Sequence, residues 1–202
     1  MIALRGLGLL RRGVSGLAAG LAWIAGWNYL ACAVFVTADI LGRNLLGVSS
    51  AATVEVTGYM LACGIALALA HTLATRAHIR VDVLVNNLPV RWRAPLHLLA
   101  LALLLGFAAF AAWAAWELVA ESALCDAHDN SALRVPLVIP QGIWAAGLST
   151  FVLMCAVLLL EAALALVLGE ARQVDRLLGS RSLEDETAEA LDAVAMAKAP
   201  AP

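Results

Sequence analysis

The fold of this chain is decided by an apolar stretch near its end, Gly142–Leu168, which reads GIWAAGLSTFVLMCAVLLLEAALALVL. A helix rises about 1.5 Å per residue and the hydrocarbon layer of a bilayer is about 30 Å thick, so about 20 mostly apolar residues can cross it. The only charged residue in this stretch is Glu161, near its end. The stretch is therefore predicted to be a membrane-spanning helix.

Three earlier stretches have the same character and run over Leu17–Ile40, Val54–Leu73 and Leu96–Val119. Of the 202 residues, 63% are apolar and 14% are charged, whereas soluble domains carry about 45–50% apolar and about 25% charged residues. With only 13 Lys and Arg in the chain, a basic nucleic-acid surface is excluded. We therefore predict an all-α integral membrane protein with four transmembrane helices.

The first apolar stretch follows a basic start, as the core of a cleaved signal peptide would. That core is usually about 7–15 residues long, and the stretch from Leu17 to Ile40 is longer. No small-residue A-x-A cleavage site follows it. We therefore expect this stretch to be retained as a true span.

The arginines are distributed unequally between the two sides of the predicted membrane domain. An even number of spans places both ends and the middle connection on one side, and that side holds ten arginines against two, Arg43 and Arg134, on the other. Because positive residues concentrate on the cytoplasmic side, we predict that both termini are cytoplasmic. The predicted parts are a basic N-terminus (1–16), a membrane domain (17–168) and a tail (169–202) that is mobile and acidic.

The connection after the second span is the most patterned part of the chain. Val81, Leu84, Val85 and Leu88 follow the spacing of one helical face, and Pro89 ends the run. This pattern predicts a short helix in the cytoplasmic interface between spans two and three. Two interpretations remain open, a solvated turn with basic anchors and a surface docked against a partner subunit.

Charged residues lie near the ends of the spans and not at their midpoints. Asp39 and Arg43 are four residues apart at the end of the first span, and Glu55 begins the second span on the same side. We expect an ion pair between Arg43 and Glu55 to tie the first two helix ends together. Charges in such positions usually anchor a helix, because long side chains reach the interface at low cost.

Other polar residues suggest alternatives that the sequence supports only weakly. His71 and His97 could approach each other and hold a haem, as in membrane anchors of respiratory oxidoreductases. The run Cys125-Asp126-Ala127-His128-Asp129 has the composition of a metal site but no ligand spacing to match. The four cysteines stand far apart, which disfavours a thiol oxidase and a disulfide framework. No cofactor is expected.

Several short motifs are similar to those of one family of small membrane proteins: Gly42-Arg43-Asn44, Glu55 with Tyr59, Ala77-His78-Ile79-Arg80-Val81-Asp82, Leu88-Pro89, and Ile139-Pro140-Gln141. With four spans and both ends inside, the chain resembles the small membrane subunit of tripartite ATP-independent periplasmic (TRAP) transporters. The resemblance covers about Leu17 to Leu168. It departs from the family at Val54-Glu55, where two acids are usual.

The resemblance implies a role and partners. A larger membrane subunit would carry the substrate and sodium sites, and a periplasmic receptor would deliver the solute, often an organic acid. The small subunit would be a scaffold in the bacterial inner membrane, with no enzymatic activity. The candidate structural or partner-interface residues are Arg43, Glu55, His78, Arg80 and Asp82. The alternative function is a membrane anchor subunit of a respiratory oxidoreductase, with or without haem.

Overall fold

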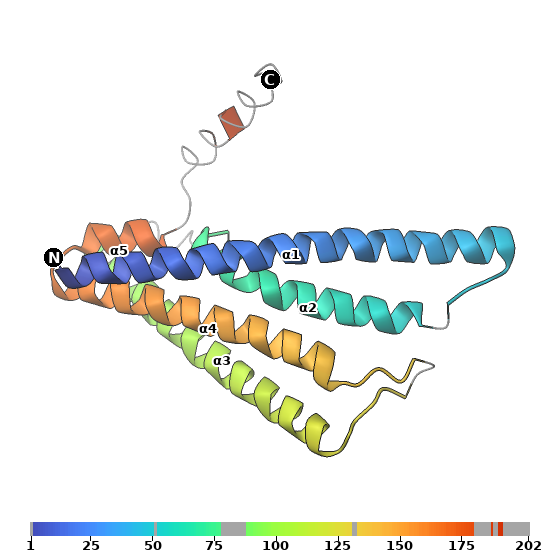
Figure 1. Ribbon diagram of the computed structural model, residues 1–202. Coiled ribbons are helices and arrows are strands. Elements are labelled where there is room, and N and C mark those ends of the chain that lie inside the picture. Colours follow the sequence, from blue (N-terminus) through green and yellow to red (C-terminus); the bar gives the residue numbers. More distant parts are fainter. Residues whose placement is uncertain are drawn as a thin grey trace.

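The computed structural model describes residues 2–50, 52–77, 88–130, 133–179, 187, 190 and 191. Within these ranges the named elements are all helices: α1 (Ile2–Leu46), α2 (Thr53–Ala74), α3 (Val90–Leu124), α4 (Val138–Val167) and α5 (Ala171–Leu178), shown in Figure 1. The first four are long and apolar enough to cross a membrane. This confirms the all-helical class and the four candidate spans.

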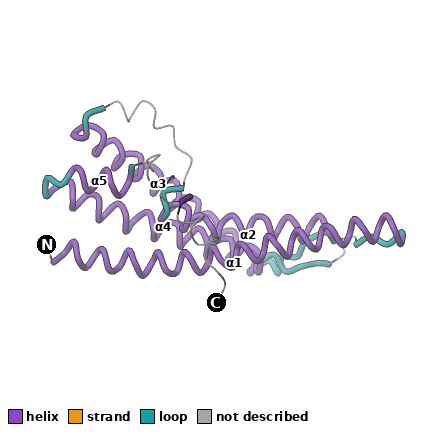
Figure 2. The backbone as a smooth tube through the Cα atoms, turned by 90° about the horizontal axis from the view of Figure 1, so that it is seen from above, coloured by secondary structure: helices purple, strands orange, loops and turns teal. Residues whose placement is uncertain are grey.

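The two ends of the helix bundle are formed by different segments of the chain. The start of α1, the end of α4 and α5 gather at one end, which we call the N-terminal end (Figure 1; Figure 2). The connections from α1 to α2 and from α3 to α4 lie at the opposite end, which we call the hairpin end.

Helix α4 is the centre of the bundle. It packs against α1, α2, α3 and α5, whereas α2 makes no contact with α3. Its buried residues Phe151, Met154 and Leu158 form the main core together with residues of the neighbouring helices. Gly147 allows α2 to approach closely, because a Cβ built there would lie 2.7 Å from the carbonyl carbon of Ala66. The fourth apolar stretch is therefore the most enclosed span.

Helix α1 is much longer than the apolar stretch that predicted it. Its 45 residues extend about 67 Å, roughly twice the hydrocarbon thickness. The basic N-terminal segment, predicted over residues 1–16, is helical from Ile2 onward. Val14 and Ala18 are buried in the core, so this extension packs along α4. The helix therefore starts well before the hydropathy signal does.

Helix α3 also starts before the apolar stretch that predicted it, and a further helix, α5, follows the last span. The third helix begins at Val90, six residues before Leu96, so Pro95 lies inside it. Helix α4 ends in a turn in which the amides of Gly169 and Glu170 donate to the carbonyls of Leu166 and Ala165. Gly169 has φ +79°, which suits a glycine. The chain then enters α5, whose Val174 and Leu178 are buried.

The predicted interfacial helix lies outside the described residues, because residues 78–87 are not among them. Its candidates His78, Arg80 and Asp82 therefore have no structural description. Beside this segment, Arg91 and Trp92 lie in the first turn of α3, and the guanidinium carbon of Arg91 lies 6.0 Å from the centre of the Trp92 ring.

Candidate functional site

A group of three polar side chains, Glu55, Tyr59 and Asp129, forms what we call the hairpin-end cluster. The Tyr59 hydroxyl in α2 donates a hydrogen bond of 2.6 Å to Oδ2 of Asp129, in the connection between α3 and α4. Oε1 of Glu55, one turn earlier in α2, lies 3.4 Å from the same hydroxyl. The cluster therefore ties the first turns of α2 to the connection between α3 and α4.

The two carboxylates of this cluster, Asp129 and Glu55, differ in the hydrogen bonds that they accept. The hydrogen bond from Tyr59 lowers the pKa of Asp129, and the backbone amide of Asn130 also donates to its carboxylate at 2.6 Å. Oε2 of Glu55 is buried and has no hydrogen-bond partner within the described part of the chain. Both carboxylates therefore lie close to the single hydroxyl group of Tyr59, and Asp129 accepts the shorter hydrogen bond from it.

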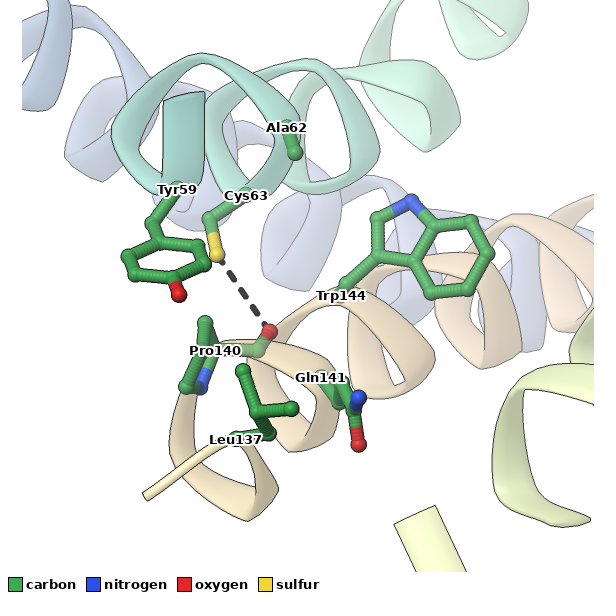
Figure 3. Close-up of a pocket in the computed structure, with 7 residues that line it drawn as sticks. All are labelled: Tyr59, Ala62, Cys63, Leu137, Pro140, Gln141 and Trp144. Carbon is green, nitrogen blue, oxygen red and sulfur yellow. Dashed lines mark hydrogen bonds between the residues drawn. The ribbon is translucent and has the colours of Figure 1, made fainter. Parts of the chain in front are cut away.

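A small pocket of about 200 Å³ lies beside the cluster, between α2 and the start of α4. Figure 3 shows Tyr59, Ala62 and Cys63 of α2 facing residues of α4 and the Leu137 that precedes it. The Cys63 thiol donates to the carbonyl of Pro140 at 3.4 Å, which links the two walls. Oε1 of Gln141 is buried, and no described group donates to it. The pocket is mainly apolar, so its walls serve packing more than polar recognition.

The N-terminal end holds a second polar network made of ion pairs. Nε of Arg11 in α1 lies 2.8 Å from Oε2 of Glu161 in α4, whose side chain is only 6% exposed. Arg93 of α3 is paired with Asp175 of α5, and Nε2 of His97 lies 3.8 Å from the same carboxylate. These pairs join α1 to α4 and α3 to α5 where the helices leave the apolar region.

The comparison with known families fits this architecture. The family model described as "Tripartite ATP-independent periplasmic transporters, DctQ component" matches residues 32–167. The match covers most of the chain and all of α2, α3 and α4. The chain belongs to this family. It is a small permease subunit of a TRAP transporter, as its motifs predicted. Neither the curated proteins nor the solved structures gave a match.

The structure does not bring Arg43 and Glu55 of this TRAP subunit together. Arg43 is exposed in the last turn of α1, and no ion pair joins it to Glu55 within the described residues. Its neighbour Asp39 instead accepts hydrogen bonds from the amide of Ser50 at 2.7 Å and the hydroxyl of Ser49 at 3.3 Å. Asp39 therefore holds the connection that leads into α2.

The stagger of the first two helices explains why this pairing fails. The side-chain amide of Asn28 donates to the carbonyl of Met60, which aligns these two positions. Arg43 lies fifteen residues beyond Asn28, whereas Glu55 lies only five residues from Met60 toward the same end. This difference of ten residues places the two residues about 15 Å apart along the helix axes.

The family match does not favour the haem alternative. His71 belongs to α2 and His97 to α3, two helices that do not pack directly against each other. His97 instead faces Asp175. In the connection between α3 and α4, Nδ1 of His128 lies 2.7 Å from the carbonyl oxygen of Asp126. The described residues contain no group of three or more potential metal-binding side chains.

Sequence reasoning missed Asp129 and Asp175 as interaction partners. Each lies far along the chain from the residue that it binds, and neither belongs to a spacing motif. A usable signal did exist for Glu161, because an acid within an apolar span requires a partner. The basic residues near the start of α1, Arg11 among them, were the natural candidates.

Proposed function

We propose that this TRAP small permease subunit is a scaffold for the large transport subunit during ion-coupled uptake of a solute, an organic acid by class. The proposal extends the family match, which carries it. A second feature supports it: Asp, Glu, Lys and Arg are absent between Arg12 and Asp39, between Glu55 and Arg76, between Arg93 and Glu117, and between Arg134 and Glu161. Ion and carboxylate sites near the bilayer midplane usually require such groups or broken helices.

We further propose that the subunit lies in the bacterial inner membrane with its N-terminal end in the cytoplasm. The bias of ten arginines against two supports this orientation. The connection with His78, Arg80 and Asp82 would then lie at the cytoplasmic face, where it contacts the large subunit. Arg43, Glu55 and the hairpin-end cluster would face the periplasm, where the solute receptor arrives.

Fusions to a reporter that is active only in the periplasm test the orientation. A fusion after Asn130 is expected to be active, and fusions after Asn87 or Gly179 are expected to be silent. Activity of the fusion after Asn87 would reverse the proposed orientation.

Reconstitution into liposomes tests the scaffold role. The isolated chain is expected to give no sodium-driven uptake of an organic acid, whereas the chain with its large subunit and a loaded receptor restores uptake. The large subunit with receptor but without this chain is the matched control, and it is expected to be inactive. Uptake by the isolated chain would contradict the proposal.

A further inference from the structure

Two tryptophans of α1, Trp23 and Trp27, stand on the surface of the bundle. Their exposed fractions are 69% and 56%, and their rings pack edge to face with centroids 5.8 Å apart. Together with Ala22, Gly26 and Leu30 they line a shallow groove of about 420 Å³ on the helix. None of the other helices that the structure describes covers the rings of this pair.

The depth of these tryptophans is unusual for the residue type. Trp23 lies eleven residues, about 16 Å, beyond Arg12, and Trp27 lies twelve residues, about 18 Å, before Asp39. A hydrocarbon layer of about 30 Å centred between these charges places both rings about 10 Å or more inside it. Tryptophan normally concentrates at the two membrane–water interfaces.

The other four tryptophans follow the normal rule. Trp92 lies between two arginines, and Trp113 and Trp116 lie within about 6 Å of Glu117 along α3. Trp144 lies about 9 Å from the start of α4. Only the pair in α1 is far from both a charge and a helix end.

The indole N–H groups give a reason to expect protein, not lipid, against this pair. Trp116 donates its indole N–H to the Ser149 hydroxyl of α4 at 2.9 Å. Within the described part of the chain, neither Trp23 nor Trp27 donates a hydrogen bond. Lipid tails offer no acceptor, and a polar group without a partner in hydrocarbon is costly.

The rest of this α1 face has the residue spacing and the open space that a second helix could pack against. Trp23, Trp27, Leu30 and Val34 follow one another at alternating spacings of four and three residues, and all are exposed. The same spacing continues backwards to Gly16 and Gly20, where an added Cβ would meet nothing within 4 Å. The glycine at 64 differs, because a Cβ there would lie 2.9 Å from the Tyr29 ring of α1. Gly16 and Gly20 therefore leave room that the chain itself does not use.

We propose that this α1 face, from Gly16 to Val34, is the docking surface for a transmembrane helix of the large TRAP subunit. The proposal rests on the proposed function, which supplies a partner that lies in the membrane. The partner helix approaches closely at Gly16 and Gly20, as small residues at four-residue spacing allow. It presents small residues and a hydroxyl or carbonyl acceptor to the indole N–H groups of Trp23 and Trp27. Aromatic anchors of this kind often dominate an interface.

The test is recovery of this chain on an affinity-tagged large subunit after co-expression and mild detergent extraction. The double variant Trp23→Leu/Trp27→Leu removes the rings and keeps the surface apolar. The variant Gly20→Leu fills open space, so it blocks the partner without touching the chain's own core. Each is expected to reduce recovery about tenfold or more, while the thermal unfolding of the isolated chain stays unchanged.

Matched controls come from the outward face of α3. Gly106 is also mid-helix and open, and Trp113 is also exposed, so Gly106→Leu and Trp113→Leu make the same chemical changes elsewhere. Both are expected to leave recovery unchanged. Full recovery of the α1 variants, or equal losses in the α3 variants, would overturn the docking surface.

Two further outcomes separate this inference from the proposed function. If the wild-type chain is not recovered with the large subunit, the scaffold role itself fails. If the wild type is recovered and the isolated chain forms a dimer that the α1 variants break, the face belongs to a second copy and only the docking proposal fails.

Discussion

Helices α4 and α1 are both long and apolar enough to cross a membrane, but their surroundings differ. In the most apolar window of α4, 44% of residues are buried inside the chain, against 11% in that of α1. Gly147 in α4 and Gly64 in α2 lie directly against neighbouring residues, whereas the glycines in the first half of α1 face open space. Hydropathy thus identifies a span, but burial depends on which elements surround it. The following experiments compare these two helices and the contacts at their ends.

The largest expected effect comes from placing the same methyl group in each helix. In Gly147→Ala the new Cβ would meet Ala66 at 2.7–2.9 Å, so α2 must move away from α4. We expect a loss of about 2–3 kcal/mol in unfolding free energy. Gly16→Ala is the matched control in α1 and should cause no loss, because nothing lies within 4 Å. Thermal unfolding of the isolated chain in detergent measures both, and equal losses would remove the contrast between the helices.

The second comparison uses two variants that each remove the one ion pair described between α1 and α4, Arg11 with Glu161. Arg11→Ala leaves the Glu161 carboxylate almost fully buried, whereas Glu161→Gln leaves Arg11, whose side chain is 34% exposed, able to reach water. We expect about 2 kcal/mol of destabilisation from the first change and about 1 kcal/mol from the second, less than for a fully buried pair. Chemical unfolding of both variants gives the order. A larger loss from Glu161→Gln would contradict the burial argument.

The smallest effect concerns the hairpin end, where contacts are more exposed. Tyr59→Phe removes the hydroxyl that holds Asp129, and we expect a decrease in unfolding temperature of less than half that of Arg11→Ala. Because the folded-state pKa of Asp129 is lowered, this contribution is fully present above about pH 4 and is lost as the pH falls through the folded-state pKa. Unfolding temperatures of both proteins at pH 7 and pH 3 measure it.

Two results would contradict this account of Tyr59. The difference in unfolding temperature between the wild type and Tyr59→Phe should be smaller at pH 3 than at pH 7. A larger difference at pH 3 would mean that Asp129 is not the partner of Tyr59. Arg43→Ala is the control at the same end and is expected to change stability by less than about 0.5 kcal/mol, because Arg43 is exposed and unpaired with Glu55.

The four spans could be predicted from the sequence, because a membrane helix needs a long apolar run and few other structures contain one. The sequence was insufficient for the start of α1, since residues before Leu17 are helical through packing of Val14 and the pair from Arg11 to Glu161. The pairing of Arg43 with Glu55 failed because their axial offset depends on how α1 and α2 are staggered. The partners of Tyr59 and Arg93 come from distant segments, and no local pattern reports such contacts.

The length of α1 has a mechanical consequence. Its contact with α2 at Asn28 divides one uninterrupted rod into two arms of unequal length, about 39 Å toward Ile2 and about 27 Å toward Leu46. A tilt of about 5° around this pivot moves the longer arm by about 3 Å at its tip and the shorter by about 2 Å in the opposite direction. Arg11 and Asp39 lie on opposite arms. If α1 tilts as one body, a displacement of one tip is accompanied by an opposite displacement of the other, with no relay of side chains between them.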